Sequence, residues 1–216
     1  MIKGVVLCEF SGVVSEAFRA AGVECWSCDL LPTEGDPAFH LQQDALEVAY
    51  EMPWDFAIMH PECTKLANSG AKHLYIDGKK ANGPYWPRWE EMEVGAAFYR
   101  KLRDAPIRYK AAENPVMHGS AIKATERGPV NFYHPHFFGD PFFKLTGLEI
   151  IGFPPLVRTH YMDVPKPGTD EHKKWSKCHR MGPGVNRGLE RARFEPGFAQ
   201  AMATQWVAFM KGGYDL

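Results

Sequence analysis

Short polar clusters hold the side chains of this sequence that could do chemistry. The sharpest is Pro61-Glu62-Cys63-Thr64, because these residue types are unsuited to a buried strand. A thiolate can add to an electrophilic carbon and later leave, but a free thiol is only about 3% ionised at neutral pH and needs an activating neighbour. Lys65, Lys72 and His60 are candidates for that neighbour. We predict that Cys63 is a nucleophile; the alternative is an inert buried thiol.

Two further clusters could supply an acid and a ligand-binding turn. Glu113-Asn114-Pro115 follows an apolar run, where Glu113 could donate a proton or a hydrogen bond and Asn114 could hold the loop. In Phe10-Ser11-Gly12 the glycine lets backbone approach a ligand, and the helix that follows offers free N–H groups to a carboxylate. Asp29 ends a second apolar run, where a carboxylate can accept both hydroxyls of a ribose. An ordinary turn and ordinary strand-end acids are the alternatives.

Alternating strands and helices must position these clusters. The apolar and β-branched runs predict strands at 2–8, 23–28, 55–60, 107–112 and 148–151, and the helical patterns predict helices at 15–22, 44–50, 88–104 and 197–210. Such alternation implies a mostly parallel sheet, whose ligands bind at the carboxyl ends of the strands. Every cluster follows a predicted strand. We expect one domain over residues 1–216, with a basic, less regular segment at about 120–195.

Composition and charge limit the classes of function. The chain has 216 residues, 45% of them hydrophobic, and no apolar run of 18 residues, so we expect a globular protein with no membrane partner. Its 5 cysteines are an odd, scattered set, which indicates reduced thiols and a cytoplasmic location. Residues 1–60 carry a net charge of −8 and the remainder +7. The first part suits a cationic or neutral small molecule, and the later part suits a polyanion.

The polar segment at 64–87 is a candidate nucleic-acid surface. It combines cations that could bind phosphates with aromatic rings that could stack on bases, which suits a lid facing nucleic acid; a merely solvated, structureless loop is the alternative. The candidate contacts are Lys65, Lys72, Lys79, Lys80 and Tyr75.

The order of these clusters resembles the cytosine 5-methyltransferases, and most closely the short phage-type DNA cytosine methyltransferases. Phe10-Ser11-Gly12, Pro61-Glu62-Cys63-Thr64 and Glu113-Asn114-Pro115 carry the resemblance, with a further match at Pro196 to Trp206. It implies a Rossmann-like methyltransferase fold, α/β, with a mostly parallel sheet and helices on both faces. It also implies S-adenosyl-L-methionine as cofactor, bound by Phe10, Ser11, Gly12, Asp29, Asp44 and Pro61.

The resemblance implies a specific chemistry as well. Cys63 would add to carbon 6 of a cytosine so that carbon 5 becomes electron-rich, while Glu113 donates to ring nitrogen 3 and Asn114 fixes the loop. In duplex DNA the base must first leave the stack. The expected substrate is DNA, duplex or single-stranded, or a pyrimidine nucleotide, in the cytoplasm of a bacterial host or a phage-infected cell. A modifier of uracil in DNA and a catalytically silent binder are the alternatives.

Three features differ from the family pattern. Glu62 stands where the family has a proline, and Val13-Val14 stand where it has a second glycine. No arginine pair follows the Glu113 strand; the side chains that could occupy the corresponding region are those of His134, His136 and Lys144.

We predict no metal site. Cys25 and Cys28 should lie on opposite faces of a strand. The spacing of His160, His172, Cys178 and His179 matches no standard zinc pattern.

Overall fold

The computed structural model describes residues 1–182, 184 and 187–212. Within them one seven-stranded sheet has the order β3-β2-β1-β4-β5-β7-β6, and β7 alone runs antiparallel to its neighbours. This is a Rossmann-like α/β fold, as predicted. Its strands are β1 (Lys3–Leu7), β2 (Glu24–Cys28), β3 (His40–Leu41), β4 (Phe56–Met59), β5 (Tyr109–Pro115), β6 (Val130–Tyr133) and β7 (Thr146–Ile151).

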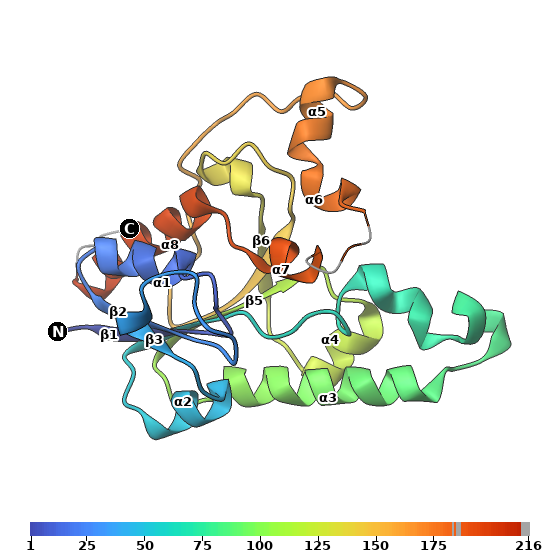
Figure 1. The fold of residues 1–216 in the computed structure, drawn as a ribbon, viewed down its shortest axis with the longest axis horizontal. Coiled ribbons are helices and arrows are strands. Elements are labelled where there is room, and N and C mark those ends of the chain that lie inside the picture. The colour runs from blue at the N-terminus through green and yellow to red at the C-terminus, as the bar shows by residue number, and fades with distance from the viewer. Residues whose placement is uncertain (183, 185–186, 213–216) are drawn as a thin grey trace.

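Helices cover both faces of the sheet (Figure 1). One face packs against α1 and α8, and the other against α2, α3 and α4. Cys25 belongs to the first hydrophobic core and Cys28 to the second, which confirms that their thiols point to opposite faces. The helices are α1 (Val13–Ala20), α2 (Ala45–Glu51), α3 (Trp86–Arg103), α4 (Gly119–Thr125), α5 (Asp170–Trp175), α6 (Lys177–Arg180), α7 (Arg187–Ala192) and α8 (Pro196–Met210).

Aromatic packing joins α8 to the sheet. The ring of Trp206 stacks on Phe153 with centroids 4.5 Å apart, and Phe198 stacks on Phe138 at 4.6 Å. Trp206 and Phe198 are fully buried. Burial of such rings is the main source of stability for this face, because each removes a large apolar area from water.

Two of the structural predictions were wrong. Strand β5 continues to Pro115, so Glu113 and Asn114 lie inside the strand, where they pair with β7, rather than in a loop after it. The segment at 64–87 is not structureless: it forms the 3₁₀ helices η2 (Asn68–Leu74), η3 (Ile76–Gly78) and η4 (Lys80–Asn82). Backbone bonds from Tyr85 to Leu74 and from Ile76 to Gly83, together with burial of Leu74, stabilise these turns.

Part of the basic segment, helices α5 and α6, forms an arm that projects from the sheet (Figure 1), whereas β6 and β7 of the same segment belong to the sheet. Helices α5 and α6 are fastened at its base, where the Trp175 ring lies 5.2 Å from Phe143 and 5.7 Å from His136. The described part of the chain contains no helix that is both long and apolar enough to cross a membrane.

Candidate active site

Three ionisable side chains meet at the carboxyl edge of the sheet, where β1, β4 and β5 end. His60 Nδ1 lies 3.7 Å from Glu113 Oε2, and both side chains are largely buried. The imidazole packs against the ring of Phe194, 5.2 Å away, and its charge acts on buried Glu9. The pairing of β4 with β5 ends at Met59 and Ala112, and His60 and Glu113 are the residues that directly follow this pair.

Cys63 sits in a short turn directly after this edge. Its carbonyl accepts hydrogen bonds from the backbone of Leu66 and Ala67, each at 2.9 Å. The carboxylate of Glu62 is engaged within the turn, because its Oε1 accepts a hydrogen bond from the backbone N–H of Thr64 at 2.7 Å. Buried Arg88 donates to the carbonyl of Thr64 at 2.9 Å. The thiol is half-buried on a loop whose backbone is held at several points.

The electrostatic surroundings oppose ionisation of this thiol. Burial raises the pKa of Cys63 to about 12, and the carboxylates of Glu113 and Glu62 add to the rise. One cation opposes it, the guanidinium of Arg191 from α7. Glu113 therefore lies close enough to Cys63 for its charge to act on the thiol.

The cations considered as activators are engaged elsewhere or exposed. Lys65 Nζ lies 2.6 Å from Glu91, and His60 faces Glu113. Lys72 is exposed on η2. Sequence reasoning missed Arg191, because nothing in a sequence shows that a helix 128 positions later returns to the cysteine.

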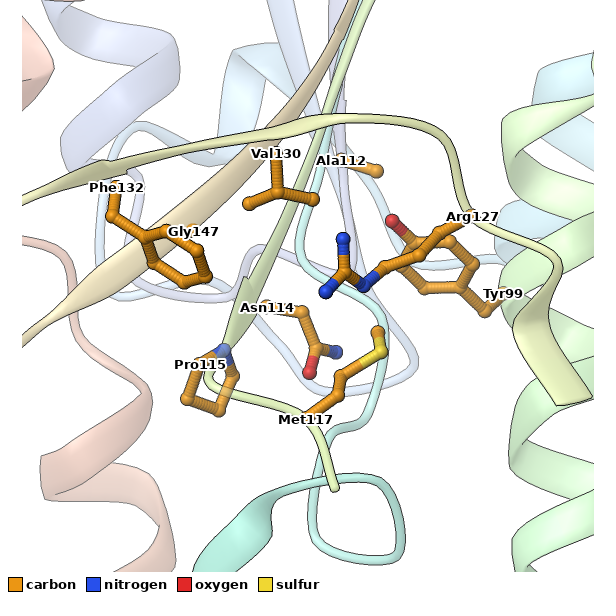
Figure 2. A pocket seen from close by; sticks show the side chains of 9 residues that line it. All are labelled: Tyr99, Ala112, Asn114, Pro115, Met117, Arg127, Val130, Phe132 and Gly147. Carbon is orange, nitrogen blue, oxygen red and sulfur yellow. The ribbon is translucent and has the colours of Figure 1, made fainter. Parts of the chain in front are cut away.

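Asn114 points to the opposite face of the sheet from Glu113. Its side chain is 5% exposed, and neither its amide nitrogen nor its carbonyl oxygen has a hydrogen-bond partner. It lines a cavity of about 10 Å³, room for roughly one water molecule; Figure 2 shows Asn114 and Arg127 side by side there, with Tyr99 and Met117. The loop after β5 is held instead by backbone bonds, Asn68 N to Val116 O and His118 N to Leu66 O.

The turn between β1 and α1 is closed by the chain itself. Glu9 accepts from the N–H groups of Val14 at 2.6 Å and Ser15 at 3.1 Å, so the start of α1 is not free for an external carboxylate. Gly12 has φ +76°, and a Cβ there would lie 3.0 Å from the Cα of Gly35. The close approach that a glycine allows at this position is thus made by the backbone of the loop after β2.

That loop also covers the neighbouring residues of the turn. The carbonyl of Phe10 accepts from Glu34 N at 2.8 Å and from Thr33 Oγ1 at 2.9 Å. Phe10 itself is buried, as is Pro61, whereas Ser11 stays half-exposed. Among these three, Ser11 is the residue that a ligand could contact.

Asp29 and Asp44 each have a local role and a remaining acceptor. Asp29 Oδ1 accepts from Leu31 N at 2.9 Å, and Asp44 is the N-cap of α2, with Oδ1 accepting from Leu46 N at 2.7 Å. The second carboxylate oxygen of each has no hydrogen-bond partner in the described structure. Both charges act on the half-buried thiol of Cys8 and help to raise its pKa, so the two acids converge at this edge.

The predicted nucleic-acid residues divide into two groups. Lys72, Lys79 and Lys80 are exposed. Lys65 is paired, and Tyr75 is half-buried with its ring 6.5 Å from that of Trp89. At the start of α3, Tyr85 and Trp86 are instead the exposed aromatic rings of this segment, at 51% and 65%.

The α5–α6 arm carries a groove of about 370 Å³ lined by cations. Lys173 and Lys174 pair with acids one turn earlier, at 2.6 Å and 3.3 Å. Lys177 and Arg180 have no acidic partner among the described residues. The remaining lining residue is Met181.

In the described part of the chain no group of three or more His, Cys, Asp or Glu side chains is arranged to hold a metal ion. The side chain of His179 lies outside the described residues.

Comparisons with known proteins return structures only: no family model matches the chain, and no curated protein matches it. The chain is similar to a prophage-encoded Escherichia coli protein described as a DNA modification methyltransferase, with 15% identity and a TM-score of 0.43 over 69% of this chain and 46% of that one. It is also similar to the Entamoeba histolytica methyltransferase EhMeth, with 12% identity and a TM-score of 0.44 over 75% and 58%.

A third similar structure is a DNMT2 variant from Spodoptera frugiperda, with 14% identity and a TM-score of 0.36 over 77% of this chain and 56% of that one. The chain spans about half the length of these proteins. Similarity at this level does not assign a function.

Proposed function

We propose that this protein is an S-adenosyl-L-methionine-dependent methyltransferase that acts on carbon 5 of cytosine in DNA through a covalent adduct with Cys63. The observation that carries the proposal is the convergence of the Cys63 thiol and the Glu113 carboxyl at one sheet edge, where the charge of Glu113 acts on the thiol. Addition to a pyrimidine needs both groups, a nucleophile for carbon 6 and an acid for ring nitrogen 3.

The charges of this pair indicate which protonation states suit the reaction. With Glu113 ionised, its carboxylate raises the pKa of the Cys63 thiol. When Glu113 holds a proton, that repulsion disappears and the thiolate becomes easier to form. The form with a thiolate and a protonated carboxyl is therefore the one that fits attack. As the sulfur–carbon 6 bond forms, the proton on Glu113 passes to ring nitrogen 3, and it returns when the thiol leaves.

The cofactor would bind at the acidic edge of the sheet, but not through all of the groups that the resemblance implied. Asp29 would accept from the ribose hydroxyls and Asp44 from the adenine amino group, each through its remaining oxygen. Ser11 would contact the methionine part, but the N–H groups of Val14 and Ser15 in the first turn of α1 cannot, because Glu9 occupies them. The bound cofactor supplies a methyl group on a positively charged sulfur, which suits an edge rich in carboxylates.

A nucleic-acid substrate fits the basic surfaces beside this edge. Exposed Lys72, Lys79 and Lys80 lie on the turns after Cys63, and unpaired Lys177 and Arg180 lie on the α5–α6 arm. Cations placed on segments before and after the catalytic edge would bind backbone phosphates without reading sequence.

Covalent trapping tests the proposal. A DNA oligonucleotide with 5-fluorocytosine, incubated with the protein and S-adenosyl-L-methionine, should form a stable adduct, because fluorine cannot leave as a proton. Intact-protein mass spectrometry should show the adduct for the wild type and for the control Cys178→Ala, but not for Cys63→Ala. An adduct that survives Cys63→Ala would refute the assigned nucleophile. Cofactor binding without adduct or methylated product would favour the silent binder.

A further inference from the structure

The imidazole of His60 faces the Glu113 carboxyl where β4 ends beside β5. Its Nδ1 lies 3.7 Å from Glu113 Oε2, and the two side chains are 12% and 15% exposed. The backbone holds both residues in place: His60 N donates to the carbonyl of Leu7 in β1 at 2.9 Å, and Glu113 pairs with Leu148 in β7. The ring and the carboxyl are therefore held beside each other before any substrate binds.

Packing fixes the orientation of the ring. Its centroid lies 5.2 Å from that of buried Phe194, which in turn lies 4.8 Å from the ring of Phe198 in α8. The second ring nitrogen, Nε2, is buried and has no hydrogen-bond partner among the described residues. Because a carboxyl oxygen faces Nδ1 and no partner faces Nε2, the neutral ring carries its proton on Nδ1.

No side chain other than His60 holds the Glu113 carboxyl. In the part of the chain that the structure describes, this carboxyl forms no further hydrogen bond or ion pair. Lys65, the first cation after β4, pairs with Glu91 at 2.6 Å. The imidazole also acts on the charge of Glu9, but that carboxylate is occupied by the N–H groups at the start of α1. His60 is thus the side chain placed to orient Glu113.

We propose that His60 is the positioning residue of Glu113: its Nδ1–H donates to Oε2, which leaves Oε1 to carry the proton toward the pyrimidine. A separation of 3.7 Å exceeds a hydrogen bond, but such contacts are often long in the free enzyme and tighten when the substrate binds.

This inference rests on the proposed function, in which Glu113 is the acid. The proton moves from Oε1 to ring nitrogen 3 as the bond between the Cys63 sulfur and carbon 6 forms. The carboxylate that remains is stabilised by the Nδ1–H of His60. When the sulfur leaves carbon 6, the proton returns from nitrogen 3 to Oε1, so no proton is consumed.

Rescue by a matched variant tests the inference. Asn can place an amide N–H near the position of Nδ1, whereas Leu fills a similar space without a donor. We compare the rates of 5-fluorocytosine trapping in wild type, His60→Leu and His60→Asn, and we repeat His60→Leu in the Glu113→Gln background. His160→Leu is the control, because His160 is exposed and lies beside Gly139 instead. Circular dichroism checks that each variant is folded.

His60→Leu should slow trapping by about tenfold or more, a part of the 10²- to 10⁴-fold that general acid assistance contributes. His60→Asn should recover most of the rate, and His160→Leu should not change it. In Glu113→Gln, His60→Leu should have no further effect, because the ring acts through the carboxyl.

Two results would overturn the inference while the proposed function stands. One is an equal rate of trapping in wild type and folded His60→Leu. The other is an equal loss in the Glu113→Gln background, which indicates a structural role of the ring. If the wild type itself forms no adduct, the proposed function fails and the inference fails with it.

Discussion

Glu9 offers the most direct test of how the sheet edge is built. Its carboxylate is 4% exposed and accepts from two N–H groups at the start of α1. In Glu9→Ala both donors lose their acceptor inside the protein. A buried unsatisfied donor costs about 1–3 kcal/mol, so the loss of the acceptor for both donors should lower the free energy of unfolding by about 2–6 kcal/mol. At about 2–4 °C per kcal/mol for a chain of this size, that corresponds to a fall of about 4–24 °C in Tm.

Thermal unfolding followed by circular dichroism measures this change. Glu16→Ala is the matched control, because Glu16 lies on the same helix but is exposed, and its pair with Arg19 spans 3.8 Å. An exposed pair of this kind contributes little, so the control should stay within about 2 °C of wild type. If Glu9→Ala also stayed within that range, the carboxylate would not be what holds the end of α1.

The same residue predicts a pH dependence. Burial raises the pKa of Glu9 above its ordinary value of 4.5, although the charge of His60 and the two hydrogen bonds oppose the rise. The folded chain therefore binds this proton more tightly than the unfolded chain. The resulting stability is fully present below about pH 4.5 and is lost as the pH rises through the folded value. The Tm of wild type relative to Glu9→Gln should thus increase as the pH is lowered from about 8 to about 5; a constant difference would contradict the shift.

Three other substitutions separate the parts of the site. Glu113→Gln should speed alkylation of Cys63, because it removes a charge that raises the pKa of the thiol. The same substitution should slow 5-fluorocytosine trapping by about 100-fold or more, the scale of general acid assistance. A change of both rates in the same direction would exclude separate roles. Asp29→Ala should weaken S-adenosyl-L-methionine binding in calorimetry by about 1.5–3 kcal/mol through loss of charge-assisted hydrogen bonds, and equal affinity would remove Asp29 from the cofactor site. Replacing Lys79 and Lys80 together with Met should reduce the slope of log affinity for DNA against log salt by up to about 2; an unchanged slope would show that η3 and η4 do not touch phosphates.

Most of the fold could be predicted from local patterns. Alternating apolar runs located β1, β2, β4 and β7, and the stripe from Trp89 to Leu102 located α3, because each pattern reports the burial of its own element. Strand β3 was missed, since His40–Leu41 is too short to show a period. The end of β5 was misplaced because polar Glu113 and Asn114 look like loop residues, while pairing with β7 extends the strand over them.

The site was less accessible to sequence reasoning for a physical reason. Cys63 and Glu113 could be named as candidates because each follows a predicted strand, and parallel strands bring their ends together. The pairing of charged side chains, in contrast, depends on contacts between segments that are distant in the sequence. Glu9 looked like one more acid before a turn, although it fills the N-terminus of α1. Lys65 looked like an activator of Cys63, although Glu91 on α3 engages it.

The position of α8 has a consequence for how this chain acquires its structure. Helix α8 packs beside α1, although roughly 180 residues separate them in sequence. While the ribosome makes the earlier part, β1, β4 and β5 can pair, but the apolar face that carries Phe56 and Phe153 still lacks the Trp206 ring that covers it. Contacts of such long range form late and slowly, and an uncovered sheet face invites aggregation in the meantime. Completion of the core must therefore wait for the end of α8, and this face of the sheet stays exposed to water until then.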